Sequence, residues 1–181
     1  LAYHESLCVY RAICKQMLAH GGFLLHAAVI EVDGRAYAFS APSGTGKSTH
    51  IALWRRYLGE RVQIINGDKP ILRYKDGSFI AYGTPWCGKD GINQNKRVPI
   101  AGICYLKQGD VNAIRTLDPQ EAMIYTICQT TKRLPAAEIM SHMLANVDAI
   151  VGKVPMYELE NKPELAAAQL SYETMRAGSK V

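Results

Sequence analysis

The spacing of hydrophobic side chains changes from helical to strand-like along the N-terminal part of the chain. Between Tyr3 and His20, apolar residues recur every three or four positions, which predicts an amphipathic helix. Phe23 to Val32 is a nearly continuous apolar run, which predicts a buried strand. Asp33-Gly34 then predicts a tight turn into a second strand, Arg35 to Ala41.

Short apolar segments continue through the middle of the chain. A glycine-rich loop leads into a predicted helix from Ser48 to Leu58, and Val62 to Ile65 predicts a short buried strand. Ile71 to Tyr74 and Phe79 to Tyr82 flank a turn, which predicts a hairpin. The next predicted elements are a long polar loop from Gly83 to Arg97, a strand from Val98 to Lys107, and its expected hairpin partner, Val111 to Arg115.

The last third of the chain is mostly helical in its pattern. Asp118 is the expected cap of one helix, because Pro119 suits a first helical position and Glu121 completes a capping box. The remaining predicted elements are a helix from Pro135 to Val151, a strand from Val154 to Leu159 and a helix from Pro163 to Arg176.

These elements predict an α/β protein. Strands dominate the core, about residues 23–116, and helices dominate residues 117–181. The frequent hairpins predict mixed sheets. A chain of 181 residues without repeats or low-complexity tracts is expected to form a single domain, 1–181.

Composition excludes several classes of protein. Hydrophobic residues make up 48% and charged residues 20% of the chain, as in globular and unlike disordered proteins. No apolar run approaches the roughly 20 residues of a membrane-spanning helix. The net charge of +5 comes from scattered basic pairs rather than tracts, so we expect neither a nucleic acid nor a membrane as a partner.

The cysteines indicate a reducing compartment. There are 5 of them, scattered and without Cys-x-x-Cys spacing, which argues against a disulfide framework or a zinc site. Charged residues run through the predicted first helix, so we expect no signal peptide there. We therefore expect a cytoplasmic protein.

The strongest chemical signal is the loop between the second predicted strand and the helix after it. Glycines let several backbone N–H groups approach a polyphosphate, and a helix N-terminus favours an anion. Lys47 can span the β- and γ-phosphates, and Ser48 can bind Mg²⁺. Ala41 stands where the usual pattern has its first glycine. The predicted nucleotide-binding residues are Ser43, Gly44, Thr45, Gly46, Lys47, Ser48 and Thr49.

Asp68 is the candidate carboxylate of the site. It follows a short apolar run, about where a phosphate-loop protein delivers a carboxylate to its metal or to a substrate hydroxyl. Asn66-Gly67 is equally typical of a hairpin turn that Asp68 would merely complete. The local sequence leaves both interpretations open, and the phosphate loop upstream favours the functional one.

Other polar residues near the loop have ordinary explanations as well. His26 lies in the apolar run, where a histidine is more often a core residue than a catalyst. His50 is expected on a solvated helix face, turned away from a ligand. Lys89 and Arg97 could neutralise a transferring phosphoryl group, but from composition alone an ordinary surface loop is the better explanation of both residues.

Residues 43–49 resemble the nucleotide loop of the phosphoenolpyruvate carboxykinase superfamily. Leu25 to Val29, the hairpin and the loop together resemble the catalytic domain of HPr kinase/phosphorylase, which phosphorylates a serine of a small carrier protein. Two further segments resemble the sequences of bacterial relatives of that kinase, namely Asn66 to Pro70 and Gly83 to Lys89. The resemblance covers about Phe23 to Lys107 well and the C-terminal helices in outline.

The resemblance implies a phosphoenolpyruvate carboxykinase-like P-loop fold with C-terminal helices, a homo-oligomer, and roles for several residues. His26 matches an active-site histidine, and Asp68 matches the second of two aspartates that serve metal binding and proton abstraction. Gly67 stands where the family has the first of these two aspartates. Three possibilities follow: Asp68 alone serves both metal binding and proton abstraction, another residue supplies the second carboxylate, or the site is weakened. Arg97 aligns loosely with an arginine near the phosphates. We expect no carboxykinase activity, because there is no room for a separate substrate domain.

We therefore predict an ATP-dependent kinase that uses Mg²⁺ and transfers the γ-phosphoryl group to the hydroxyl of a serine in a protein, a peptide or a free amino acid. The predicted catalytic residues are Asp68, His26, Lys47, Arg97 and Lys89, and the predicted metal ligands are Ser48 and Asp68. One alternative is a nucleotide-sensing module that has lost catalysis, and another is a phosphate-loop protein that only hydrolyses ATP.

Overall fold

The fold is α/β, as expected, in a computed structural model that describes residues 2–88, 90–130 and 137–179. The helices are α1 (Ala2–Leu18), α2 (Lys47–Leu58), the 3₁₀ helix η1 (Gly59–Arg61), α3 (Pro119–Cys128), α4 (Ala137–Val151) and α5 (Leu165–Gly178). The strands are β1 (Gly22–Leu24), β2 (Ala27–Val32), β3 (Arg35–Ser40), β4 (Gln63–Asn66), β5 (Ile71–Lys75), β6 (Ser78–Tyr82), β7 (Arg97–Gln108), β8 (Ala113–Thr116) and β9 (Met156–Asn161).

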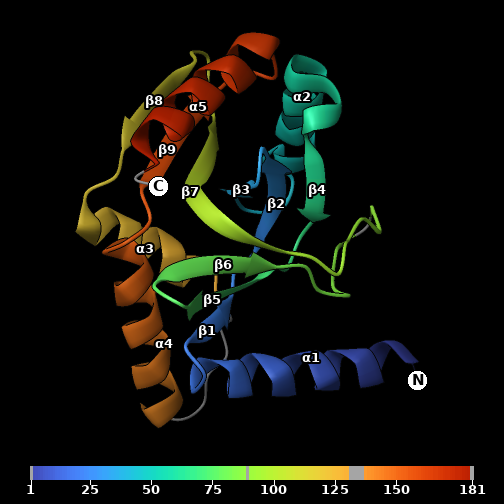
Figure 1. Ribbon diagram of the computed structural model, residues 1–181, viewed down its shortest axis with the longest axis vertical. Helices are drawn as coiled ribbons and strands as arrows, with labels where there is room; N and C mark the ends of the chain where they lie inside the picture. Colours follow the sequence, from blue (N-terminus) through green and yellow to red (C-terminus); the bar gives the residue numbers. More distant parts are fainter. Residues whose placement is uncertain (1, 89, 131–136, 180–181) are drawn as a thin grey trace.

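The strands form one curled mixed sheet (Figure 1). Its order is β1-β5-β6-β7-β3-β2-β4, while β9 pairs with β7 and carries β8 on its other side. The long β7 joins the two parts of the sheet, because its first residues pair antiparallel with β6 and its later residues pair parallel with β3 and β9. The hairpins β2–β3 and β5–β6 are confirmed.

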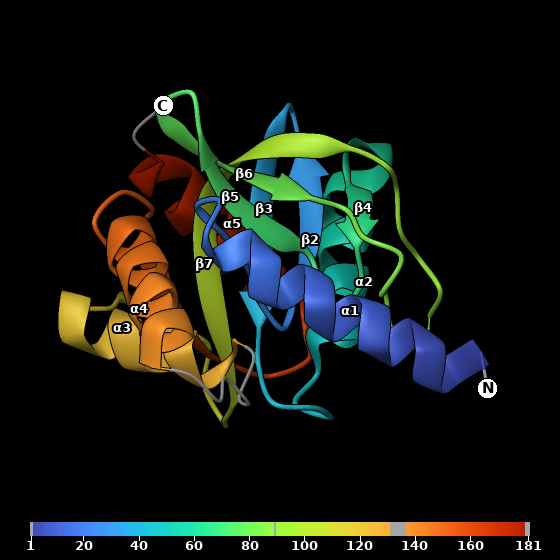
Figure 2. The same cartoon turned by 90° about the horizontal axis from the view of Figure 1, so that it is seen from below.

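The central strands are buried on both faces, which explains their continuous apolar sequence. Ala27 and Val29 of β2 belong to a hydrophobic cluster with residues of α3 and α4, whereas Ala28 and Ile30 belong to a second cluster with α2 and α5. Seen from below, α1 passes in front of β5 and β6, next to α4 (Figure 2). The predicted phosphate loop lies between the end of β3 and the start of α2.

The predicted strand from Phe23 to Val32 is in fact two strands. β1 pairs with β5, and β2 pairs with β3 and β4, so the chain leaves the sheet between them. There the N–H of Leu25 donates to Pro70 O at 3.2 Å and the N–H of His26 donates to Gln129 O at 2.7 Å. An unbroken apolar run does not reveal this interruption, because distant segments satisfy the backbone.

The predicted hairpin between residues 98–107 and 111–115 is wrong. β8 pairs antiparallel with β9, and β9 pairs in parallel with β7. The edge of β7 is therefore occupied by a strand from the C-terminal part of the chain, and β8 lies one strand further out. The predicted strand from Val154 to Leu159 is confirmed as β9, and its place beside β7 in the central sheet is what the sequence did not show.

His50 of α2 is buried rather than solvated, with 1% of its surface exposed. Its Nε2 accepts a hydrogen bond from Trp54 Nε1 at 3.1 Å and lies 3.1 Å from Ser171 Oγ of α5. Burial lowers the pKa of His50 to about 4, so its ring is neutral at neutral pH. The packing of α5 on α2 decides this environment, which the sequence around His50 does not show.

Two expectations based on composition can be compared with the described residues. None of the helices in the described ranges is long and apolar enough to cross a membrane. The five cysteines all lie within those ranges, and no disulfide joins them.

Candidate active site

The predicted phosphate loop connects β3 to α2. Gly44 and Gly46 have φ angles of 84° and 106°, a left-handed conformation that other residues rarely adopt. A Cβ at either position would meet no atom within 4 Å, so the space beside both glycines is open to a ligand. The exposed residues of the loop are Ser43, Gly44, Ser48 and Thr49, and the half-buried ones are Thr45, Gly46 and Lys47.

The helix that follows the loop begins without a competing acid. Gly46 is the N-cap of α2 and makes no side-chain capping bond, and the first turn contains no Asp or Glu. The first N–H groups of a helix have no partner within the helix. Those of α2 therefore remain available to an anion held by the loop.

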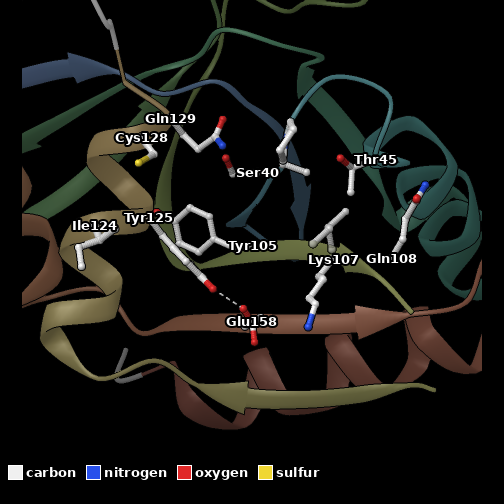
Figure 3. Close-up of a pocket in the computed structure, with 13 residues that line it drawn as sticks. Ser40, Thr45, Tyr105, Lys107, Gln108, Ile124, Tyr125, Cys128, Gln129 and Glu158 are labelled. Atoms are coloured by element: carbon white, nitrogen blue, oxygen red, sulfur yellow. Dashed lines mark hydrogen bonds between the residues drawn. The ribbon is translucent and has the colours of Figure 1, made fainter. Parts of the chain in front are cut away.

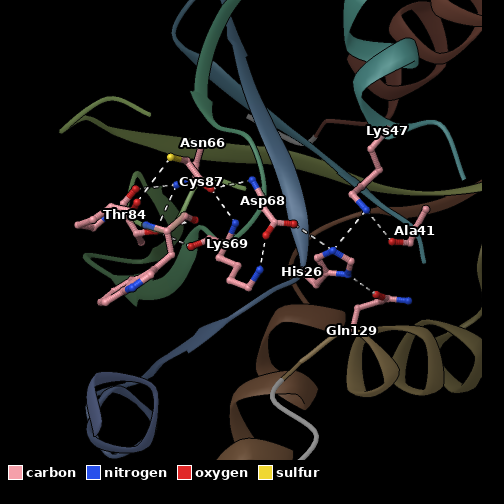
Figure 4. Close-up of polar contacts among 11 residues, drawn as sticks. His26, Ala41, Lys47, Asn66, Asp68, Lys69, Thr84, Cys87 and Gln129 are labelled. Carbon is pink, nitrogen blue, oxygen red and sulfur yellow. Dashed lines mark hydrogen bonds and ion pairs between the residues drawn. The ribbon is translucent and has the colours of Figure 1, made fainter. Parts of the chain in front are cut away.

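Lys47 turns back across the loop towards the middle of the site (Figure 4). Its Nζ donates to Ala41 O at 2.8 Å and lies 3.4 Å from His26 Nε2. Burial lowers the pKa of Lys47, and the nearby carboxylate of Asp68 opposes that change. The lysine thus lies between the loop and the residues that follow β1 and β4.

His26 and Asp68 are in direct polar contact beside Lys47. His26 Nε2 lies 3.0 Å from Asp68 Oδ1, while Nδ1 lies 3.1 Å from Gln129 Oε1. Lys69 pairs with the other oxygen of Asp68. Burial acts to raise the pKa of Asp68, but the hydrogen bonds from His26 and Lys69 outweigh it and hold the pKa at about 2. Asp68 is therefore ionised at neutral pH.

The backbone around Asp68 is fixed by a buried asparagine. Asn66 Oδ1 accepts the N–H groups of Asp68 at 2.9 Å and Lys69 at 2.7 Å, and its Nδ2 donates to Thr84 O at 2.9 Å. The N–H of Ala27 donates to Asp68 O at 3.0 Å, which brings Asp68 beside His26. No hairpin forms here, because β4 pairs with β2 while β5 pairs with β1 and β6. Of the two interpretations of Asn66-Gly67, the turn of a hairpin is excluded.

Gly67 has no room for a side chain. A Cβ at this position would lie 2.8 Å from the backbone oxygen of Cys87. The aspartate that the resemblance would place here cannot be accommodated unless the loop before β7 moves. Gly88 lies equally close to the site, since a Cβ there would be 3.0 Å from Asp68 Cβ.

The long loop before β7 brings a second carboxylate to the phosphate loop. Ser48 Oγ donates to Asp90 Oδ2 at 3.1 Å. Of the cations expected to act from this loop, Lys89 lies outside the described residues. Arg97 is exposed at the start of β7, where it pairs with Tyr82, and its predicted role stays a prediction.

A cavity of about 450 Å³ adjoins the loop on the β7 side (Figure 3). Tyr105 of β7 and Ile124 and Tyr125 of α3 give it an apolar, aromatic wall, and Thr45 lies at the opposite side. The hydroxyl of Tyr125 donates to Glu158 of β9. A cavity of this size and lining is typical of a small-molecule site.

A family model described as SynChlorMet cassette protein ScmC matches residues 5–163. The chain belongs to this family. A comparison with curated proteins gives no match. Among solved structures, the HPr(Ser) kinase/phosphatase from Coxiella burnetii is similar over 85% of this chain and 88% of that one, with 13% identity and a TM-score of 0.48. So distant a likeness transfers neither an activity nor the role of any residue.

The structure adds three residues to those expected from the sequence. Lys69 adjoins Asp68, so its proximity was visible in the sequence but its ion pair was not. Gln129 bonds to His26 from 103 residues away, and Asp90 reaches Ser48 from 42 residues away. In the sequence, the unusual length of its loop was the signal that pointed to Asp90. No feature of the sequence pointed to Gln129.

A magnesium ion is predicted to bind Ser48 and Asp68, both of which carry oxygen donors. The described residues contain no group of three or more His, Cys, Asp or Glu side chains placed to hold a metal. Mg²⁺ usually takes one or two carboxylates, keeps several waters and uses substrate phosphates as ligands. Ser48 contacts Asp90, whereas the oxygens of Asp68 face His26 and Lys69, so metal binding by Ser48 and Asp68 stays a prediction.

Proposed function

We propose that the chain is an ATP-dependent phosphotransferase that transfers the γ-phosphoryl group to a hydroxyl. The observation that carries the proposal is the line of contacts from the phosphate loop to a carboxylate. Lys47 Nζ lies 3.4 Å from His26 Nε2, which lies 3.0 Å from Asp68 Oδ1. Phosphoryl transfer depends mainly on positioning and electrostatics, so a loop that holds phosphates beside an ionised carboxylate is suited to it.

Each residue of this line has a distinct role. The N–H groups of residues 44–48 hold the phosphates, and Lys47 neutralises the charge that develops as the γ-phosphoryl group moves. Asp68 orients the acceptor hydroxyl and takes its proton late in the transfer, since a carboxylate with a pKa of about 2 is a weak base. His26 donates to Asp68 and keeps the carboxylate directed at the loop.

The arrangement of the site also leaves room for a whole nucleotide. His26 and Asp68 lie at the β2 side of β3, whereas the 450 Å³ cavity lies at its β7 side. A nucleotide lying along the loop would place its terminal phosphate at Asp68 and its nucleoside in the cavity. Mg²⁺ bound with the nucleotide supplies further neutralisation of the phosphate charge.

The acceptor is a hydroxyl compound, for which we propose serine in a peptide, a protein or free form. The family is described as a cassette protein. The other products of that cassette are therefore the first acceptors to test, alongside free serine.

The test is to measure ATP binding and phosphoryl transfer separately in the unmodified chain and in Asp68→Asn. Calorimetry gives the affinity for ATP, and transfer from γ-labelled ATP to each acceptor gives the activity. We expect Asp68→Asn to bind ATP within a few-fold of the unmodified chain and to lose transfer by about a hundredfold or more. Asp110→Asn removes the same charge at an exposed site in the turn after β7 and is expected to change neither.

The absence of a carboxylate at Gly67 favours one second candidate, a nucleotide-sensing module without catalysis. Tight ATP binding by the unmodified chain, with no transfer to any acceptor, would support that module and refute the kinase. ATP consumption that no acceptor alters would indicate simple hydrolysis. An unmodified chain that binds no ATP would refute all three.

A further inference from the structure

We propose that Gln129 is a positioning residue, which orients the ring of His26 so that its Nε2 faces Asp68 and Lys47. The proposal rests on the phosphotransferase function above, in which Asp68 and Lys47 act on the acceptor and the phosphates. Gln129 Oε1 lies 3.1 Å from His26 Nδ1. His26 Nε2, on the other side of the ring, lies 3.0 Å from Asp68 Oδ1 and 3.4 Å from Lys47 Nζ (Figure 4). The hydrogen bond of one ring nitrogen commonly sets the role of the other.

The main chain at His26 is held from two sides, although it lies outside the strands. The N–H of His26 donates to Gln129 O at 2.7 Å, and Ser40 Oγ donates to His26 O at 2.8 Å. Ser40 is fully buried, so this second bond is shielded from water. These bonds fix the backbone, but a side chain can still occupy several rotamers on a fixed backbone. The direction of the ring is therefore decided by the contacts of its own atoms.

Close packing alone does not hold the ring, because 30% of the His26 side chain is exposed. If the ring turned by half a rotation about its bond to Cβ, carbon atoms would replace both nitrogens and the contacts with Asp68 and Gln129 would be lost. The amide oxygen of Gln129 accepts hydrogen bonds and cannot donate them. It therefore stabilises the orientation in which the N–H at Nδ1 points towards it, and this orientation directs Nε2 to Asp68 and Lys47.

Gln129 is itself attached to the core of the protein through the end of α3. Its N–H donates to Thr126 O at 3.0 Å. Thr126 is fully buried, and its Oγ1 lies 2.6 Å from the hydroxyl of Tyr105 of β7. Residues that orient a functional group work best when their own positions are locked by packing and hydrogen bonds. The attachment of α3 to β7 thus gives Gln129 the fixed position that orienting His26 requires.

The first experiment compares two side chains of similar length at this position. Gln129→Met removes the accepting oxygen, whereas Gln129→Glu keeps one. We expect Gln129→Met to lower the kcat of phosphoryl transfer about tenfold or more and Gln129→Glu to retain most of it. Gln129 also lines the 450 Å³ cavity, so the Kd for ATP is measured in each variant and is expected to stay similar. Gln120→Met makes the same change at an exposed position of α3 and should match the unmodified chain. Equal kcat values for Gln129→Met and Gln129→Glu would overturn the proposal.

The second experiment observes the ring itself, by nuclear magnetic resonance of the full chain labelled with ¹⁵N-histidine. The ring signals of His26 are assigned by their loss in His26→Gln. We expect Nδ1 of His26 to give the signal of a nitrogen that carries a hydrogen, and the ring signals to shift in Gln129→Met but not those of the exposed His142. Unchanged His26 signals in Gln129→Met would contradict the inference and leave the kinase function standing.

Two outcomes remain to be separated. If Gln129→Met fails to fold by circular dichroism, the unmodified chain decides, since an Nδ1 without a hydrogen there would exclude the bond to Gln129 Oε1. Absence of phosphoryl transfer to every acceptor by the unmodified chain would refute the proposed function, and this inference with it.

Discussion

Asp68→Asn should destabilise the folded protein as well as stop transfer, because it removes an anion that lies among basic groups. Asp68 contacts His26 and Lys69 directly, and its charge also acts on Lys47. The side chain is only 18% exposed, so water screens these interactions weakly. An asparagine of the same shape would leave the basic groups facing one another without a negative charge.

The magnitude follows from the pKa of Asp68. The folded protein holds this pKa at about 2, below the value of about 3.9 that an aspartate has in an unfolded chain. By linkage the difference contributes about 2 kcal/mol to the free energy of unfolding at pH 7. Because the folded pKa is the lower one, the contribution is complete above about pH 5, falls to about half near pH 3 and disappears below about pH 2.

Urea denaturation followed by tryptophan fluorescence measures this contribution. We expect the unmodified chain to exceed Asp68→Asn by about 2 kcal/mol at pH 7 and by about half as much at pH 3. His50 titrates in both proteins, so its contribution cancels when the two free energies of unfolding are subtracted. The control Asp110→Asn measures how much stability changes when an exposed carboxylate is removed. Equal stabilities at pH 7, or a difference that does not change with pH, would refute the reasoning.

Two further substitutions test other parts of the structure. Gly67→Ala should lower the free energy of unfolding by about 1–3 kcal/mol, because its Cβ would lie 2.8 Å from a backbone oxygen. In the control Gly152→Ala the nearest contact of the Cβ is at 3.6 Å, and the free energy of unfolding should change by less than about 1 kcal/mol. Equal melting temperatures in the two variants would contradict the steric argument. Burial lowers the pKa of His50 to about 4, so the unmodified chain should lose stability as pH falls from about 6.5 to 4, where only the unfolded chain takes up the proton. Urea midpoints should show a smaller loss in His50→Gln than in the exposed control His142→Gln, and the same pH dependence in both would contradict a buried neutral ring.

Local signals in the sequence were sufficient for many elements of the fold. The turn at Asp33-Gly34 forms the expected hairpin, with both residues at positive φ. Asp118 caps α3, and its side chain accepts the N–H groups of Gln120 and Glu121 at 2.9 Å each. Such features depend on the dihedral preferences and hydrogen bonds of adjacent residues, so they can be recognised without knowing the rest of the fold.

The sequence by itself determined the α/β class, the hairpins β2–β3 and β5–β6, the capped helix and the glycine-rich loop, since each depends on residues close together in the chain. Only the tertiary structure decided that the chain breaks at His26, that β9 lies beside β7, and that Gln129 and Asp90 reach the site. These arrangements join segments far apart in the chain. They depend on which faces pack together and on which distant groups satisfy buried backbone atoms, and a one-dimensional pattern contains neither.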